Sequence, residues 1–144
     1  MIPLSNISNY EIITYPTRTY FLDRNSNRIM GVVDGIEAMQ QAIYKALNTE
    51  RFDYVIYSHN YGITLKDLFG KDRYIACAVL ERRIRDTLLA DDRITDVSGF
   101  EFKVYRHSVL VKFNVTTTIG QIAEEVELNV WEYDIRKYIK KCII

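Results

Sequence analysis

Hydrophobic and polar residues recur with two different periods along the chain, and the changes of period separate strand-forming from helix-forming segments. Two runs rich in β-formers, Thr19–Asp23 and Arg28–Val33, flank the turn-prone residues 24–27 and predict a β-hairpin. Apolar residues then recur every three or four positions, which predicts a helix from the N-cap residue Asp34 to about Asn48. Its core-facing positions are expected to be Ile36, Met39, Ile43, Ala46 and Leu47, and its solvent-facing positions Gln40, Gln41 and Lys45.

A second helical pattern follows the N-cap residue Asp72 and covers roughly residues 73–90. Its buried side is expected to consist of Ile75, Val79, Leu80, Ile84 and Leu88. Oppositely charged residues four positions apart on the solvent side predict two ion pairs, Glu81 with Arg85 and Arg82 with Asp86.

From Arg93 onward the apolar residues alternate with polar ones, which predicts three consecutive strands with reversals near Arg106-His107 and Ile119-Gly120. The alternating apolar positions are Ile94, Val97, Phe100, Phe102 and Val104, then Val109, Val111, Phe113 and Val115, then Ile122, Val126, Leu128 and Val130. Consecutive strands with short reversals form an antiparallel meander, and two amphipathic helices are expected to cover one of its faces. The predicted fold class is therefore α+β, with an N-terminal hairpin and two main helices packed on a C-terminal antiparallel three-stranded meander.

The segment between the two helices is the least regular part of the chain. We expect a short strand over Tyr54–Tyr57, a turn over residues 58–62, and a short helix over residues 63–69 that ends at Gly70.

The two ends of the chain lack the pattern of the central part. Residues 1–17 have no hydrophobic period and are expected to form an N-terminal arm. Residues 131–144 place Ile135, Tyr138, Ile139 and Cys142 at helical spacing with lysines between them, which predicts a C-terminal helical tail. A single domain is expected over residues 18–130.

Composition narrows the function classes without naming one. The 144 residues are 48% hydrophobic and 26% charged, as in soluble globular proteins, and 19 basic residues balance 19 acidic ones. This balance gives no electrostatic reason to expect a nucleic acid or an anionic membrane as partner. The two cysteines, Cys77 and Cys142, have no metal-site spacing, and no secretory signal or membrane-spanning run is recognisable. No cofactor or metal is expected.

Candidate catalytic chemistry is sparse. The phosphate-binding, zinc-protease and nucleophile-elbow motifs are absent from the sequence, and the two histidines lie near predicted turns. The one enzymatic alternative is a carboxylate pair for glycoside hydrolysis, and its candidates in the central segment are Glu50, Asp53, Asp67 and Asp72. Eleven tyrosines are compatible with a protein interface or with a core rim.

Three runs of the sequence together resemble the baseplate wedge proteins of contractile phage tails. They are Tyr15–Tyr20, Gly31–Ala38 and Thr49–Ser58, the last followed by Asn60-Tyr61-Gly62. The resemblance is greatest to the PBSX-type prophage branch of that family. It implies a non-enzymatic structural subunit, present in several copies in the tail baseplate or in a phage-tail-like particle and assembled in the bacterial host cytoplasm. The implied partners are other wedge proteins, the sheath protein and a tube or hub protein; the alternative is a lysozyme-like muralytic tail enzyme, and a soluble binding module is a third hypothesis.

The resemblance also implies two partner surfaces. A family Glu-Arg motif contacts the helical wedge core; here Glu50-Arg51 keeps the residue types, whereas spacing from Tyr61-Gly62 points to Asp53-Tyr54. The wedge-core candidates are Thr49, Glu50, Arg51, Asp53, Tyr54, Tyr61 and Gly62. The C-terminal strands are expected to template the first sheath ring by strand addition, with candidates Val109, Val111, Phe113, Val115, Ile122, Val126 and Leu128.

Overall fold

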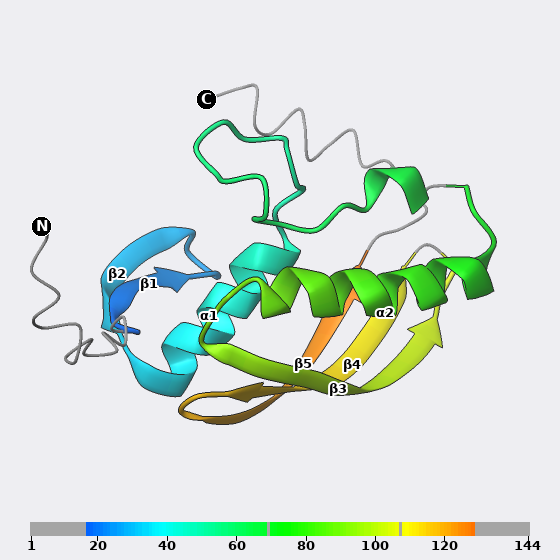
Figure 1. Ribbon diagram of the computed structural model, residues 1–144. Helices are drawn as coiled ribbons and strands as arrows, with labels where there is room; N and C mark the ends of the chain where they lie inside the picture. The colour runs from blue at the N-terminus through cyan, green and yellow to red at the C-terminus, as the bar shows by residue number, and fades with distance from the viewer. Residues whose placement is uncertain (1–16, 69, 107, 129–144) are drawn as a thin grey trace, which may run out of the picture.

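Two helices cover one face of a three-stranded antiparallel sheet, and a separate two-stranded hairpin lies beside the first helix (Figure 1). The structure is a computed structural model that describes residues 17–68, 70–106 and 108–128, so the predicted C-terminal tail and all but the last residue of the N-terminal arm lie outside the described residues. The elements are β1 (Thr19–Asp23), β2 (Arg28–Val33), α1 (Gly35–Leu47), the 3-10 helix η1 (Lys66–Leu68), α2 (Arg73–Leu89), β3 (Ile94–Val104), β4 (Val109–Thr117) and β5 (Gly120–Leu128). The predicted α+β class, hairpin, helices and meander are confirmed.

The hairpin is bound to α1 by the side chain of Gln41, a residue that the hydrophobic pattern predicted to face solvent. The Gln41 side chain accepts a hydrogen bond from the Leu22 amide and donates one to the Tyr20 carbonyl, both at 2.8 Å. Gln41 is therefore buried, and the prediction that it faces solvent is wrong. Its side chain forms hydrogen bonds with the outer edge of β1, where a further strand would otherwise pair. On the partner strand, Gly31 adopts a φ of 74° where the register shifts, which is the geometry of a glycine bulge.

Both predicted N-caps are present. The Asp34 carboxylate accepts a hydrogen bond from the Gly35 amide, and the Asp72 carboxylate accepts one from the Tyr74 amide. The buried sides of the helices differ in detail from the predicted ones, since Ile36 and Ile75 are 45% and 57% exposed. The residues buried on the helices are Ala38, Met39, Gln41, Ile43 and Leu47 on α1, and Ala76, Leu80, Ile84, Thr87 and Leu88 on α2. The two predicted i,i+4 ion pairs on α2 are confirmed.

The sheet has the order β3-β4-β5, so β4 lies in the centre and is hydrogen-bonded on both sides. Alternate side chains of β4 point toward the helices and form the middle of the core with the buried faces of α1 and α2. The opposite face is polar, and Lys112 pairs there with Glu125 of β5 at 3.0 Å. One cluster of buried side chains joins both helices, η1 and all three strands.

The segment between the helices is where the predicted elements fail. Residues 54–57 form turns rather than a strand, and of the expected helix over residues 63–69 only the single turn Lys66–Leu68 is helical. Val55 and Ile56 are exposed, because no neighbouring strand pairs with this segment within the described residues. Leu68 is fully buried and anchors η1 to the core.

Candidate functional site

The loop between α1 and η1 is closed by backbone contacts between its two ends, and we call residues 49–65 the closed loop. Glu50 and Ile63 form an isolated parallel β-bridge. The Arg51 amide donates to the Ile63 carbonyl at 3.0 Å, and the Ile63 amide donates to the Thr49 carbonyl at 2.9 Å. Gly62 has a φ of 91°, and a Cβ added to it would lie 2.5 Å from the Thr49 carbonyl oxygen. The closing point therefore requires glycine.

The side chains of the candidate Glu-Arg motif reinforce this closure. The Glu50 carboxylate accepts hydrogen bonds from the amides of Leu65 and Lys66, at 3.0 and 3.3 Å. Partial burial raises the pKa of Glu50, while these two amide donors and the positive charge of Lys66 oppose the rise. Arg51 donates through Nε to the Gly62 carbonyl at 3.1 Å. Glu50 and Arg51 lie at the start of the closed loop, and each binds backbone atoms at the end of the loop rather than the other side chain.

The alternative pair, Asp53 and Tyr54, lies in the same loop. Asp53 forms an ion pair with Lys66 at 2.6 Å. The Tyr54 ring meets Tyr57 edge-on with centroids 6.0 Å apart, and Tyr57 stacks on Tyr61 at 4.4 Å. The structure therefore brings all seven wedge-core candidates into one loop and leaves the choice between the two pairs open.

The closed loop presents apolar side chains that sequence reasoning did not single out. Phe52, Val55 and Ile56 are 72%, 104% and 85% exposed. Phe52 has a φ of 71°, a conformation that bulky residues rarely adopt. A hydrogen-bonded loop that holds three large apolar side chains in solvent is typical of a protein contact surface. Because the sequence pattern favours a strand over Tyr54–Tyr57, it does not reveal that Val55 and Ile56 are exposed.

A small cavity of about 150 Å³ lies beside the closed loop and is lined by Arg51, Thr64, Arg83, Asp86 and Thr87. Arg83 holds both carboxylate oxygens of Asp67, at 2.5 and 2.6 Å, and this contact lowers the pKa of Asp67.

The four carboxylates of the enzymatic alternative each have a structural contact. Glu50 holds backbone amides, Asp53 pairs with Lys66, Asp67 pairs with Arg83, and Asp72 caps α2. None of the four lines the larger cleft described next. Among the described residues, no group of three or more His, Cys, Asp and Glu side chains is placed to hold a metal ion.

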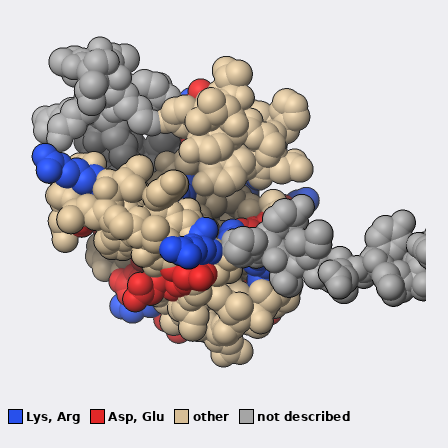
Figure 2. Space-filling model, turned by 90° about the vertical axis from the view of Figure 1, so that its left-hand side faces the viewer, with Lys and Arg blue, Asp and Glu red and all other residues tan. Residues whose placement is uncertain are grey.

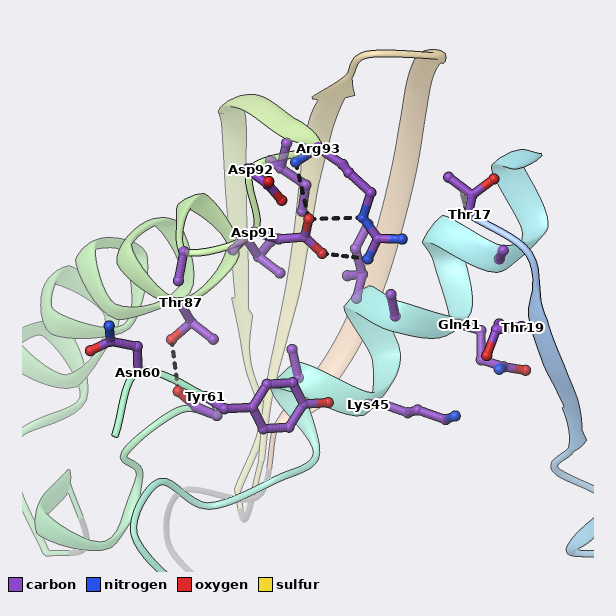
Figure 3. A pocket seen from close by; sticks show the side chains of 18 of the residues that line it. Thr17, Thr19, Gln41, Lys45, Asn60, Tyr61, Thr87, Asp91, Asp92 and Arg93 are labelled. Atoms are coloured by element: carbon purple, nitrogen blue, oxygen red, sulfur yellow. Dashed lines mark hydrogen bonds and ion pairs between the residues drawn. The ribbon is translucent and has the colours of Figure 1, made fainter. Parts of the chain in front are cut away.

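The larger cleft, of about 640 Å³, lies between the start of β1, α1, the closed loop and the end of α2 (Figure 3). Arg93 binds both carboxylate oxygens of Asp91, at 2.9 and 2.6 Å, and this contact lowers the pKa of Asp91. The Tyr61 ring points across the cleft toward Lys45 in Figure 3, and its burial raises the pKa of the hydroxyl.

The strand-addition candidates occupy two different environments. Four of them, Val109, Val111, Phe113 and Val115, lie on β4, face the core and are at most 2% exposed. Because β4 is paired with β3 on one side and β5 on the other, it has no free edge for an incoming strand in the described sheet. The other three candidates, Ile122, Val126 and Leu128, lie on β5, which is an edge strand of the described sheet. Their side chains face inward, so β5 offers its backbone at the edge.

The two edges of the sheet are built differently. β3 shifts register twice against β4, once near Thr95 and once at Gly99, which has a φ of 69°. β5 pairs with β4 over nine residues without a shift. Bulges twist an edge away from further pairing, and β5 is the more regular of the two edges.

Charges of both signs lie next to one another on the face that Figure 2 shows, with uncharged side chains between them. No helix in the described part of the chain is long and apolar enough to cross a membrane.

Two comparisons with known proteins identify the family of the chain. The family model described as contractile injection system sheath initiator matches residues 17–120. The chain is also 37% identical over 114 residues to the phage-like element PBSX protein XkdS of Bacillus subtilis (strain 168). That alignment covers 76% of this chain and 80% of the relative.

Proposed function

Because the chain belongs to the family of contractile injection system sheath initiators, we propose that it templates the first sheath ring of a contractile tail by accepting a strand of sheath protein along β5. The observation that carries this proposal is the regular, unbulged edge of β5, beside the bulged edge of β3. Main-chain hydrogen bonds along such an edge give affinity without requiring a pocket.

The turn between β4 and β5 determines which peptide groups of β5 point away from β4 and can bind another strand. Thr117 and Gly120 close a two-residue turn and form its hydrogen-bonded pair. Hydrogen-bonded and open pairs alternate along an antiparallel ladder, so the peptide groups of Gln121, Ala123 and Glu125 point away from β4. An incoming strand binds these groups in our proposal.

The second part of the proposal assigns the closed loop to the baseplate wedge core. Its support is the closure of the loop by hydrogen bonds of Glu50 and Arg51, together with the exposed side chains of Phe52, Val55 and Ile56. The proposed role is structural, and the proposed partners are wedge proteins and sheath protein, with tube or hub proteins as further neighbours. Several copies per particle, assembled in the host cytoplasm, are part of the same proposal.

The experiment that tests strand addition is sheath polymerisation started by this protein. Substoichiometric wild-type protein is expected to shorten the lag before purified sheath protein polymerises. Ala123→Pro removes one outward amide without removing a bond to β4, so it is expected to restore most of the lag. Ala123→Ser keeps the amide and is the matched control, with wild-type behaviour expected. A folded Ala123→Pro variant that starts polymerisation as well as wild type would show that β5 is not the template.

A further inference from the structure

Two side chains of α2 bind backbone carbonyls at the end of the closed loop. Arg83 donates through Nη1 to the Thr64 carbonyl at 2.5 Å, and Thr87 donates through Oγ1 to the Gly62 carbonyl at 3.3 Å. Figure 3 shows the bond from Thr87. Because the two donors are four positions apart, they lie one above the other on the same face of the helix. One face of α2 therefore binds the loop end at two successive turns.

Arg83 makes the more extensive of these two contacts. In addition to the Thr64 carbonyl, it binds both carboxylate oxygens of Asp67, at 2.5 and 2.6 Å. Asp67 belongs to η1, which follows the closed loop directly. Bidentate bonds between a guanidinium and a carboxylate are strong and fix the geometry of both groups. Three oxygen atoms from the loop end and η1 thus converge on one side chain of α2.

The closed loop has little apolar contact with the rest of the molecule. Within residues 49–65, only Gly62 and Ile63 are buried, and Ile63 belongs to the core cluster. The backbone bonds that close the loop join its two ends to each other. A single buried side chain holds the loop end at the core but leaves the direction of the loop tip to the polar contacts around it. Arg83 supplies the most extensive of those contacts from α2.

We propose that Arg83 is a positioning residue that fixes the orientation of the closed loop relative to α2 and the sheet. Closure and orientation are then separate properties of the loop. Closure comes from the backbone bonds between the loop ends, and orientation comes from the contact with α2. This contact sets the direction in which the exposed apolar side chains of the loop face a partner. Its consequence for wedge proteins rests on the proposed function, whereas the orientation itself does not.

Residual dipolar couplings of backbone amides measure the orientation of the loop in the full-length protein. In wild type, the couplings of residues 50–63 are expected to fit the alignment tensor of α2 and β4. Arg83→Gln removes the guanidinium and is expected to reduce these couplings by about half or more, because a loop that samples several orientations averages them. The amides of Arg51 and Ile63 should remain protected from hydrogen exchange, since the closure of the loop is retained.

Three further variants make the test specific. Arg82→Gln is the matched control, because the Arg82 side chain lies on the same helix, is 86% exposed and pairs with Asp86 at 3.7 Å. It is expected to give the couplings of wild type. Arg83→Lys keeps the charge but lacks the planar fork that binds both Asp67 oxygens, so intermediate couplings are expected. Asp67→Asn leaves the bond to Thr64 in place and is also expected to give intermediate couplings. These two milder variants keep the test valid if Arg83→Gln fails to fold.

Two results would overturn the proposal. Loop couplings of wild-type size in folded Arg83→Gln would show that Arg83 does not orient the loop. Loss of protection at the Arg51 and Ile63 amides would show that Arg83 closes the loop instead of orienting it. Capture of wedge proteins by Arg83→Gln is expected to fall severalfold. If wild type captures no wedge protein while the couplings respond as expected, the proposed function fails and the positioning role stands.

Discussion

Gly62 is the residue at which the closed loop depends on backbone geometry rather than on side-chain chemistry. Its φ of 91° and the 2.5 Å approach of a hypothetical Cβ to the Thr49 carbonyl oxygen exclude any side chain without a backbone shift. Such a shift would weaken the bond from the Ile63 amide to Thr49 and move Arg51 away from the Gly62 carbonyl. The conformation of the closed loop therefore depends on Gly62.

Gly62→Ala is expected to lower the free energy of unfolding by at least about 2 kcal/mol, from left-handed strain and weakened backbone hydrogen bonds. Gly70→Ala is the control, because Gly70 has a φ of 80° but open space around it and carries only the strain, about 1 kcal/mol. Denaturant unfolding of the two variants measures the difference. Equal losses would show that the contact at Thr49 has no energetic weight.

At the scale of the element, the edges of different strands are protected from pairing with other chains in different ways. The outer edge of β1 is occupied by the Gln41 side chain, and the edge of β3 is twisted by bulges. The edge of β5 is regular, yet its core-facing row contains Glu124 between Ile122 and Val126. Burial raises the pKa of Glu124, although the nearby positive charge of Arg24 and a hydrogen bond with Gln40 oppose this. Inward-pointing charges on edge strands discourage pairing between identical edges.

Glu124→Val is expected to make the isolated protein self-associate, because it removes the charge that guards the β5 edge. Glu124→Asp retains the carboxylate in the same row of β5 and is expected to remain as monomeric as wild type. Sedimentation velocity over a range of concentrations distinguishes the two. Identical sedimentation of Glu124→Val and wild type would mean that Glu124 does not guard the edge.

At the scale of the whole molecule, the two proposed partner surfaces lie on different sides of the helices. In Figure 1 the closed loop lies on the side of α1 and α2 away from the sheet, while β5 belongs to the sheet itself. A subunit built in this way can hold a baseplate protein on one side and a sheath strand on the other. The two activities should therefore be separable by mutation.

Val55→Asp is expected to abolish capture of wedge proteins while leaving the start of sheath polymerisation unchanged. The Val55 side chain is fully exposed, so stability should remain within about 0.5 kcal/mol of wild type. Ile29→Asp, at an apolar hairpin residue that is 68% exposed, is the control and should capture wedge proteins normally. Pull-down from assembly mixtures measures capture, and normal capture by Val55→Asp would refute the assignment of the loop.

The sequence by itself determined the elements whose side chains repeat with a clear period. The hairpin, both helices with their N-caps Asp34 and Asp72, and the order of the meander follow from local spacing, because amphipathic segments must bury one face. The family resemblance followed from short runs of residues and was confirmed over residues 17–120.

Only the tertiary structure decided what lies at edges and in loops. Gln41 is buried because β1 needs a partner for its outer edge, and no helical period contains that information. The alternate valines of β4 are buried because both helices pack on that face of the sheet, so these side chains are not available to a partner. The residues predicted as a strand at 54–57 are turns because Glu50, Arg51 and Gly62 close the loop over them. Contacts between residues distant in sequence set these features, and local pattern does not encode such contacts.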